Sequence, residues 1–320
     1  MNMNTEILPK DDGCQECGVI CAANESRFTA STYSEALTAF TVGWKDSERR
    51  EELLNFIAPV IPVAKRFEFK VGSNAQYFLS ETDDIRSVGA SFKRIEFEGT
   101  SITSRTYNKG LTVRVDHDDV AGDDWRERYV QLLLQRLLLN ELRRAMEALE
   151  SNAKGESAPY VWDSSANPDS NIRSELEAAA NDTGVRPNRI IIGEGAWDLR
   201  SDSYDAQNNA GATRAAGLTP EELARKLFVD AIRVVSARVQ NTSAKSNILS
   251  NKIYAFYTRN EIMKDEPANI KRFVTPIDGE TFRVYQEEHN KFTDLTVEHY
   301  SNVVLTSKDG IRKLSVSASS

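Results

Sequence analysis

Hydrophobic and polar residues alternate in three segments near the middle of the first half of the chain. These segments are KRFEFKV from Lys65, KRIEFEG from Lys93 and LTVRV from Leu111. A period of two places successive side chains on opposite faces and predicts half-buried β-strands. Asn108-Lys109-Gly110 indicates a turn before the third segment. Residues 65–115 are therefore expected to form a long, twisted β-hairpin that has few core residues and needs a surface to lie against.

The strongest helical pattern begins after Gly122. Six apolar residues recur at helical spacing and form one stripe: Val130, Leu134, Leu138, Leu142, Ala145 and Leu149. Leu132, Leu133 and Leu139 widen the apolar surface, so the helix is expected to pack on more than one side. Asp123 or Asp124 is the expected N-cap. A helix over residues 123–152 would be about 45 Å long at about 1.5 Å per residue.

Shorter patterns predict the remaining elements. Helices are expected at Ser34–Phe40, Asp46–Phe56 and Asn171–Asn181, from Ala196, and from Thr219, where Pro220 and Glu222 complete a capping box. Strands are expected at Arg189–Ile192, Ile232–Val239, Ile253–Tyr257, Phe273–Pro276, Phe282–Gln286, Leu295–Leu305 and Ile311–Val316. Asp278-Gly279 and Asp309-Gly310 predict turns. The polar stretches Ser201–Gly217 and Gln240–Asn251 are expected to be loops. The fold class is therefore α+β.

Composition and charge exclude several classes of function. The 320 residues are 40% hydrophobic and 28% charged, so a buried core is expected. The net charge of −8 argues against a non-specific nucleic-acid binder, which needs clustered Lys and Arg. The longest apolar run, Leu132–Leu139, is interrupted by Gln135 and Arg136 and is too short for a membrane span. The polar N-terminus has no apolar core of a secretory signal, so we expect a cytoplasmic origin.

Residue types that carry chemistry are few and scattered. Cys14, Cys17 and Cys21 are the only cysteines, and without a fourth ligand nearby they are expected to be reduced thiols on an N-terminal arm; a metal knuckle or an intersubunit disulfide is the alternative. His117 lies between Asp116 and Asp118, which is compatible with a metal or acid–base site but also with a polar strand end. Metal-ligand spacing is absent among the histidines and cysteines, and no cofactor is expected.

A glycine pair after the strand at Arg189–Ile192 invites a nucleotide-loop interpretation. Gly193-Glu194-Gly195 lacks the third glycine of the dinucleotide fingerprint, and Glu194 would repel a pyrophosphate. We therefore expect a strand-to-helix turn at this position. No catalytic residues and no metal site are predicted, and the chain is expected not to be an enzyme.

The order of the predicted elements resembles that of the tailed-bacteriophage major capsid protein family, whose fold is shared with encapsulins and herpesvirus capsid floor domains. The resemblance covers nearly the whole chain. It is carried by diffuse segments: FIAPVIPVAKRFEFKV, RSVGASFKRIEFEGTS, YNKGLTVRVDHDD, RPNRIIIGEGAWDLR and FRVYQEEHNKFTDLTVEHYSNVVLTSKDGIRKL. The implied fold has an N-arm, an extended β-hairpin loop, a long spine helix, a peripheral β-sheet domain and an axial α/β domain.

The resemblance implies a division of the chain. The N-terminal arm would be 1–62, the extended hairpin loop 63–116, the spine helix with the first part of the peripheral domain 117–182, the axial domain 183–262, and the return to the peripheral domain 263–320. The hairpin of one subunit would lie over its neighbour, so that hairpin charges form intersubunit pairs: Asp83, Asp84, Arg86, Lys93 and Arg94. Axial loop candidates at a symmetry axis are Tyr204, Asn208 and Arg214.

The implied function is self-assembly into the icosahedral head shell of a phage. The expected partners are other copies in pentamers and hexamers, a portal, enclosed double-stranded DNA bound without sequence specificity, and a separate scaffolding protein, because the arm is too short to serve as a scaffold. The expected location is the virion, assembled in the host cytoplasm without a membrane. Alternatives are an encapsulin-type nanocompartment shell, a metal-dependent α/β enzyme using Asp116, His117 and Asp119, or a minor structural component such as a tail protein.

Overall fold

A computed structural model of the chain describes residues 32–72, 85, 88, 91, 99–120, 122–155, 158–241 and 244–318. These residues form two compact units, which are described separately. The first unit draws on Met1–Phe67, Ser104–Ala145 and Lys271–Val304, and the second on Glu68–Thr103, Met146–Ile270 and Leu305–Ser320. None of the described helices is both long and apolar enough to cross a membrane.

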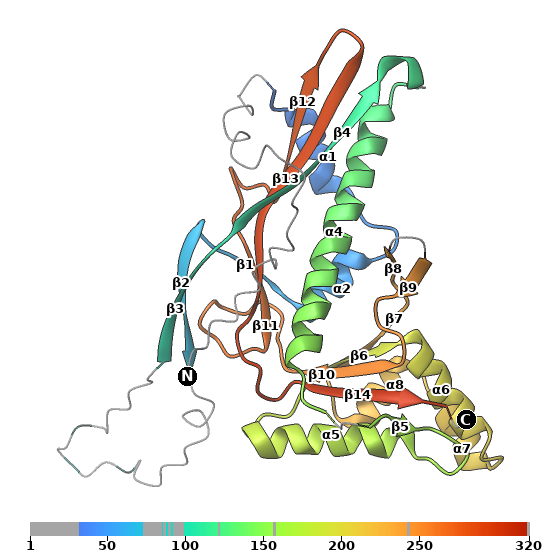
Figure 1. Cartoon of the computed structure of the whole chain (residues 1–320). Helices are drawn as coiled ribbons and strands as arrows, with labels where there is room; N and C mark the ends of the chain where they lie inside the picture. The colour runs from blue at the N-terminus through green and yellow to red at the C-terminus, as the bar shows by residue number, and fades with distance from the viewer. Residues whose placement is uncertain are drawn as a thin grey trace, which may run out of the picture. The chain divides into compact units, whose positions relative to one another are not determined.

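The first unit is built on a mixed five-stranded sheet (Figure 1). Its elements are α1 (Glu35–Gly43), α2 (Arg50–Ile57), β1 (Val60–Pro62), β4 (Tyr107–Asp116), the 3-10 turn η1 (His117–Asp119), the first part of α4 (Trp125–Asn152), β11 (Ile270–Val274), β12 (Phe282–Glu288) and β13 (Phe292–Leu305). The strand order is β1-β11-β13-β12, and β4 also pairs with β13. The strand β13 is therefore the centre of this sheet.

The prediction of a turn at Asn108-Lys109-Gly110 is wrong, because these residues lie inside β4. They pair with β13 in an antiparallel register that runs from Phe292↔Asp116 to Ser301↔Tyr107. A Cβ at Gly110 would lie 2.9 Å from the carbonyl oxygen of Val297, so the glycine permits a close approach of the two strands. The glycine that suggested a turn is instead needed where β4 and β13 lie close together.

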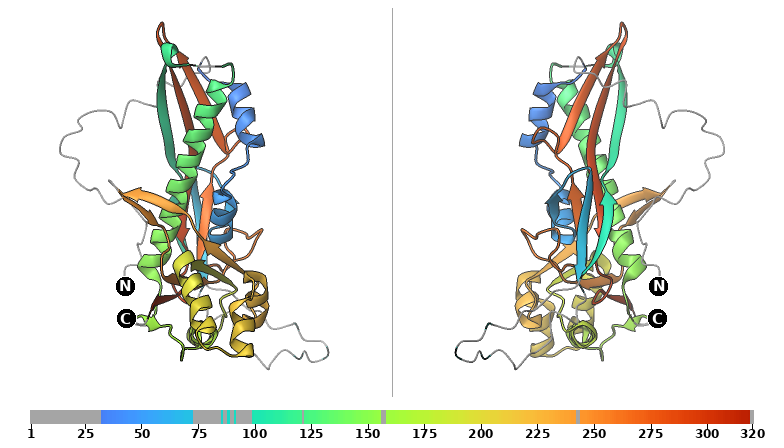
Figure 2. Two further views of the ribbon diagram at one scale, coloured as in Figure 1. Left: turned by 90° about the vertical axis from the view of Figure 1, so that its right-hand side faces the viewer. Right: turned by 90° about the vertical axis from the view of Figure 1, so that its left-hand side faces the viewer.

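The core of the first unit confirms the predicted stripe on the long helix. Val130, Leu134 and Leu138 are buried, and Leu134 packs in one cluster with residues of β12 and β13 such as Val284 and Leu295. Figures 1 and 2 show this part of α4 lying along β4 and β13. Of the residues expected to widen this surface, Leu133 is buried and Leu139 is half-buried, but Leu132 is 52% exposed, so the prediction for Leu132 is wrong.

The predicted long hairpin is divided between two sheets. β2 (Arg66–Gly72) pairs with β3 (Gly99–Arg105) in a two-stranded sheet, while β4, which follows β3, pairs with β13 instead. Backbone hydrogen bonding to β13 over the length of β4 outweighs the continued pairing that local alternation predicted. The strands KRFEFKV and LTVRV are thus confirmed as strands, but not as partners of each other.

The second unit contains a separate five-stranded sheet with helices packed on it. Its elements are β5 (Tyr160–Val161), α5 (Pro168–Thr183), β6 (Arg189–Gly193), α6 (Glu194–Asp205), α7 (Ala210–Ala216), α8 (Pro220–Leu227), β7 (Ala231–Val235), β8 (Arg238–Asn241), β9 (Ala244–Asn247), β10 (Lys252–Phe256) and β14 (Arg312–Ser317). The strand order is β5-β14-β10-β6-β7. Its core joins Ile190 and Ile253 of the sheet with Ile172, Leu176 and Leu223 of the helices.

Local capping signals place several helices of this unit correctly. Thr219 accepts from the backbone N–H of Glu222, whose side chain accepts in return from the N–H of Thr219. Gly184 follows α5 in the left-handed conformation, and the helix continues to Thr183, beyond its predicted end at Asn181. The start of α5 was predicted too late, because Asn167 caps the helix and Pro168 opens it. In the first unit, Asp46 accepts backbone N–H groups, but α2 begins only at Arg50.

Two predicted loops contain regular structure. Ser201–Gly217 includes the end of α6 and all of α7, which Asn209 caps. Gln240–Asn251 includes part of the antiparallel ribbon β8–β9. Both stretches are polar because they are short, exposed elements, so composition alone did not distinguish them from loops.

The turn between β6 and α6 explains the glycine pair without a ligand. A Cβ at Gly193 would lie 1.9 Å from the carbonyl oxygen of Ser250 and 2.0 Å from that of Leu249, and a Cβ at Gly195 would lie 2.2 Å from the Asn251 side chain. The residues 249–251 therefore pack directly against both glycines. This confirms a packed strand-to-helix turn.

Replacing Leu134 by Ala is expected to destabilise the protein by about 2–5 kcal/mol, because the side chain is fully buried between α4 and the sheet. Leu132→Ala is the matched control, since Leu132 is 52% exposed on the same helix and should change stability by less than about 0.5 kcal/mol. Urea unfolding followed by circular dichroism measures both. Equal effects would contradict the assignment of the core face.

Gly193→Ala is expected to cost about 1–3 kcal/mol through overpacking against the carbonyl oxygens of residues 249 and 250. Gly43→Ala is the control, because no atom lies within 4 Å of the added Cβ and alanine is favoured in a helix. Thermal melting of the two variants should therefore shift in opposite directions or leave only the first one affected. An unchanged Gly193→Ala midpoint would refute the close packing.

Candidate functional site

The five predicted hairpin charges lie outside the described residues. These are Asp83, Asp84, Arg86, Lys93 and Arg94. The same is true of Cys14, Cys17 and Cys21. Their predicted roles remain predictions.

The described base of the hairpin is held by the loop that precedes β11. The N–H of Lys70 in β2 donates to Asp265 Oδ1 at 2.7 Å, and Lys264 Nζ donates to the carbonyl oxygen of Glu68 at 3.0 Å. Phe69 is buried, whereas Glu68 and Lys70 are exposed, which confirms the predicted alternation. The loop thus anchors one end of a ribbon whose outer face is polar.

The three predicted axial residues lie in different environments. Asn208 is exposed in the turn between α6 and α7, with a left-handed φ of 50°, and Arg214 is exposed on α7. Tyr204 is buried, and its hydroxyl donates to Asn167 Oδ1 at 2.9 Å. Asn208 and Arg214 are therefore accessible to a partner, while Tyr204 contributes to the interior of the second unit.

A buried ion cluster beside Tyr204 organises the helices of the second unit. The fully buried Arg200 of α6 donates from Nε to Asp169 Oδ1 at 2.8 Å and from NH2 to the carbonyl oxygen of Ala215 at 2.9 Å. Lys226 of α8 donates to Asp169 Oδ2 at 2.8 Å. Burial raises the pKa of Asp169, but Arg200 and Lys226 outweigh it and hold that pKa below its usual range. The Asp169 carboxylate therefore joins α5 to α6 and α8, and Arg200 extends the cluster to α7.

The sequence analysis missed Asp169, Arg200 and Lys226. Each lies on a helix among other charged residues, so the sequence does not distinguish a buried charge from a solvated one. An Asp within the first turn of α5, next to Asn167-Pro168, is also what helix capping alone would favour. Their link depends on the tertiary contact of three helices, which no local pattern encodes.

The residues of the candidate metal site make separate contacts and do not face a common point. Asp116 Oδ1 accepts from the backbone N–H of Asp118 at 3.0 Å, and the ring of His117 contacts Thr293 Oγ1 at 2.9 Å. Asp119 is exposed at the end of η1. Across the described part of the chain, no three His, Cys, Asp or Glu side chains are placed to hold a metal ion. The arrangement is that of a strand end with an Asx turn.

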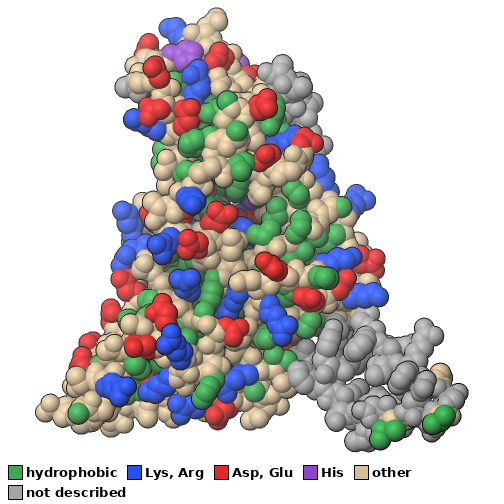
Figure 3. Space-filling model, turned by 180° about the vertical axis from the view of Figure 1, so that it is seen from behind, with side chains coloured by type: hydrophobic (Ala, Val, Ile, Leu, Met, Phe, Trp, Pro, Cys, Tyr) green, Lys and Arg blue, Asp and Glu red, His purple; other side chains and the backbone are tan. Residues whose placement is uncertain are grey.

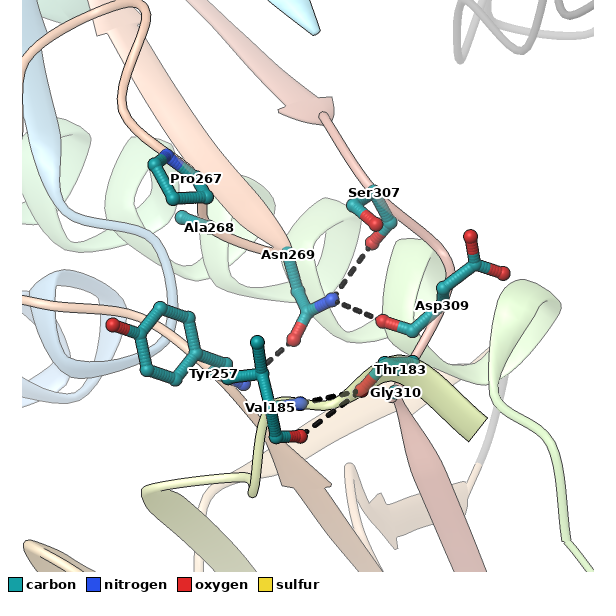
Figure 4. A pocket seen from close by; sticks show the side chains of 9 residues that line it. All are labelled: Thr183, Val185, Tyr257, Pro267, Ala268, Asn269, Ser307, Asp309 and Gly310. Carbon is teal, nitrogen blue, oxygen red and sulfur yellow. Dashed lines mark hydrogen bonds between the residues drawn. The ribbon is translucent and has the colours of Figure 1, made fainter. Parts of the chain in front are cut away.

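A small pocket in the second unit is lined by residues of α5, by the segment 257–269 and by the segment 307–310 (Figure 4). Asn269 bridges its walls: Oδ1 accepts from the N–H of Tyr257 at 2.6 Å, and Nδ2 donates to the carbonyl oxygens of Ser307 and Asp309. Thr183 Oγ1 is bonded to the carbonyl oxygen of Ala179. These polar atoms already form hydrogen bonds within the chain, so the residues around the pocket hold three segments of the chain together.

A second buried carboxylate, Glu141 of α4, lies against β4 and β13 in the first unit. Lys109 Nζ and Arg144 NH1 each donate to Oε1 at 2.7 Å, and Ser301 Oγ donates to Oε2 at 2.9 Å. His299 Nε2 is 3.1 Å from Ser301 Oγ and 3.9 Å from Glu141 Oε1. Since Ser301 donates to Glu141, Nε2 of His299 carries its proton and donates to Ser301.

The remaining ring nitrogen makes His299 sensitive to protonation. Nδ1 is buried and has no hydrogen-bond partner, so a proton there would add an unsatisfied N–H beside Lys109 and Arg272. Burial lowers the pKa of His299 below its ordinary value, although Glu141 acts in the opposite direction. Burial alone would raise the pKa of Glu141, but His299 and Lys109 hold it well below its usual range.

The folded protein is therefore expected to lose stability as the pH falls below about 6.5, the ordinary pKa of histidine. A histidine with a lowered folded-state pKa contributes stability above its unfolded pKa and loses it as the pH falls towards the folded value. Each unit of lowering corresponds to about 1.4 kcal/mol. Urea unfolding of the subunit between pH 8 and 5.5 measures the loss.

His299→Gln is expected to flatten this pH dependence, because the amide can replace Nε2–H without titrating. His289→Gln is the control, since that ring lies half-exposed in the β12–β13 turn beside Glu287. A steep loss of stability that persists in His299→Gln would assign the effect to other groups.

No protein-family model matches the sequence, and no curated protein matches it. Among solved structures, a phage-related protein from Bordetella bronchiseptica RB50 is similar, with a TM-score of 0.67 and 17% identity over 88% of this chain and 96% of that chain.

Two other solved structures have a TM-score of 0.48. The putative capsid protein of a prophage from E. coli CFT073 is 13% identical over 89% of this chain and 99% of that chain. The match to Mycobacterium phage Che8 is 11% identical over 90% of this chain and 93% of that chain.

The Bordetella match extends over nearly all of both chains, which establishes the fold but not the function. The described elements follow the predicted order: β2–β3 ribbon, long helix α4, and two sheets completed by C-terminal strands. The chain has an α+β fold that is similar, over most of its length, to the fold of this phage-related protein.

Proposed function

We propose that this chain is the major capsid protein of a tailed bacteriophage and that it self-assembles into the icosahedral shell enclosing the phage genome. The observation that carries the proposal is the element order, from the ribbon β2–β3 through β4 into the long helix α4, in a chain whose fold matches a phage-related protein. The sequence resemblance described above supports the same assignment.

The ribbon β2–β3 gives a physical reason for self-assembly. A two-stranded ribbon is marginally stable alone in water. Four described residues of β3 are exposed: Thr100, Ser101, Thr103 and Arg105. A neighbouring subunit would supply the surface that the ribbon lacks, and the hairpin charges Asp83, Asp84, Arg86, Lys93 and Arg94 would form intersubunit pairs there.

The surface charge is compatible with DNA that is enclosed and not held on a phosphate-binding face. The net charge is −8, and Lys and Arg side chains are interspersed with Asp and Glu over the face seen in Figure 3. A continuous basic field, which phosphate binding requires, is not present on that face.

The finer features of the proposal follow the family resemblance. Subunits would form pentamers and hexamers with a separate scaffolding protein and a portal, and the shell would assemble in the host cytoplasm and reside in the virion. The division into arm, hairpin loop, spine, axial and peripheral regions would follow 1–62, 63–116, 117–182, 183–262 and 263–320. The exposed Asn208 and Arg214 are proposed to face a symmetry axis. No observation specifically favours an encapsulin shell or an enzyme using Asp116, His117 and Asp119.

Full-length protein co-expressed with its scaffolding protein is expected to form closed icosahedral shells, because the scaffold directs curvature while the subunits supply the contacts. Negative-stain microscopy and sedimentation velocity check this. Omitting the scaffold is the matched control and should give irregular or open assemblies.

A subunit that stays monomeric under all assembly conditions would contradict the proposal. Uniform closed shells without a scaffold would contradict the separate-scaffold part alone. Copurification of a specific cargo protein with shells free of DNA in infected or induced cells would favour the nanocompartment.

A further inference from the structure

The helix α7 is attached to the rest of the second unit by little apolar surface. It has seven residues and packs on α6 (Figure 1). Its buried side chains are the methyl groups of Ala212 and Ala215, which cluster with Tyr204 of α6. A helix shorter than about 12 residues is marginal in water by itself and depends on its packed apolar face. Two buried methyl groups therefore leave α7 only weakly held.

The next helix along the chain is held much more firmly. The helix α8 has eight residues, and its buried side chains include Leu223 and Leu227. Both leucines belong to the core of the second unit, together with Ile190 of β6. Two helices of almost equal length in one unit thus bury very different amounts of apolar surface. Local opening of α7 is therefore expected to need less free energy than opening of α8.

Both ends of α7 adjoin segments that hydrogen bonds hold in place. At the end of α6, Gln207 Nε2 donates to the carbonyl oxygen of Ala166 at 2.8 Å. The capping box at Thr219 fixes the start of α8. The segment between these points, 208–217, begins at Asn208, whose φ of 50° is left-handed and turns the chain away from α6. This segment can move while the two flanking helices keep their hydrogen bonds.

Arg200 of α6 supplies the polar contact to the end of α7. The side chain is fully buried, and its NH2 donates to the carbonyl oxygen of Ala215 at 2.9 Å, while Nε donates to Asp169. NH1, on the same guanidinium carbon as NH2, is buried without a hydrogen-bond partner among the described residues. A buried, unsatisfied N–H is unfavourable, and opening of α7 would admit water to it. The closed position therefore combines one favourable hydrogen bond with one unfavourable group.

We propose that residues 208–217 form a flap that opens and closes on α6, with the hydrogen bond from Arg200 to Ala215 as its latch. The exposed side chains of Asn208 and Arg214 lie on this flap. A partner that contacts them in only one of the two positions would shift the flap towards that position. The flap is a property of the single subunit and does not depend on the proposed capsid function.

Hydrogen exchange of the full-length subunit before assembly, followed by mass spectrometry of peptides, tests the flap. Amide protection in α7 is expected to be at least about thirtyfold lower than in α8, because local opening exposes α7 alone. The helix α8 is the matched control, since it lies in the same unit and has almost the same length. Equal protection of the two helices would overturn the flap.

Gly211→Ala tests the same opening without removing a contact. Gly211 is exposed in α7, and the nearest atom to an added Cβ would be Asn209 Oδ1 at 3.4 Å, so the methyl group fits. Alanine favours the helix over glycine, so protection of α7 should rise up to about fivefold while protection of α8 stays constant. An equal rise in both helices would show that they open together and would overturn the flap.

Arg200→Lys tests the latch. Lysine keeps a positive charge beside Asp169 but lacks the second nitrogen that reaches Ala215. Protection of α7 should fall about tenfold, as expected for the loss of a charge-assisted hydrogen bond, and α8 should keep its protection. Arg214→Lys is the matched control, because Arg214 is exposed on α7, and it should change neither helix.

Unchanged protection of α7 in Arg200→Lys would overturn the latch. An equal loss in α7 and α8 would also overturn it, because Arg200 would then support the whole unit. The comparison of α7 with α8 in the unchanged chain, and the Gly211→Ala variant, decide the flap even if Arg200→Lys does not fold. Shell formation by the wild-type protein is a separate measurement, so failure of the flap leaves the proposed function standing.

Discussion

The backbone pairing of β13 is the constraint on which the first unit depends. This 14-residue strand pairs with β12 and β4 and is also a neighbour of β11. Because β4 pairs with β13, the two-stranded ribbon ends with β3. The 3-10 turn η1 and then α4 follow β4. Lys109 then reaches Glu141, and Ser301 of β13 reaches the same carboxylate. The register of β4 on β13 therefore places Lys109 and Ser301 where both can contact the buried carboxylate of Glu141.

The elements that the sequence predicted well have short-range causes. The capping box at Thr219 and the apolar stripe of α4 each depend on residues within a few positions of one another. The turn predicted at Asn108-Lys109-Gly110 failed because β13, almost two hundred residues away, supplies its hydrogen bonds. The loop predicted at Ser201–Gly217 failed because buried Arg200 binds the end of α7 through the carbonyl of Ala215. Long-range pairing overrides local composition in both cases.

The candidate surfaces were predictable to a different extent. The polar ribbon and the exposed Asn208 and Arg214 follow from local patterns, whereas the buried carboxylates Glu141 and Asp169 do not, because burial of a charge requires partners from other elements. Each of these carboxylates holds two cations. A buried ion cluster is weak evidence for stability, but losing one partner leaves an uncompensated charge, so such clusters favour one arrangement of helices and strands. That specificity would suit the assembly proposed above, in which every copy presents the same surface.

The open edges of the second sheet extend this reasoning to assembly. A single chain could cover an edge with a helix, a charge or a proline, as soluble sheet proteins commonly do. Here β7 ends an edge beside an exposed, left-handed Phe228, and β5 ends the other beside an exposed Val161. In the isolated subunit each feature leaves an apolar side chain exposed to water. In the assembly proposed above, such local costs in the subunit would be tolerated where a neighbouring copy removes them, and the same argument applies to the polar ribbon β2–β3.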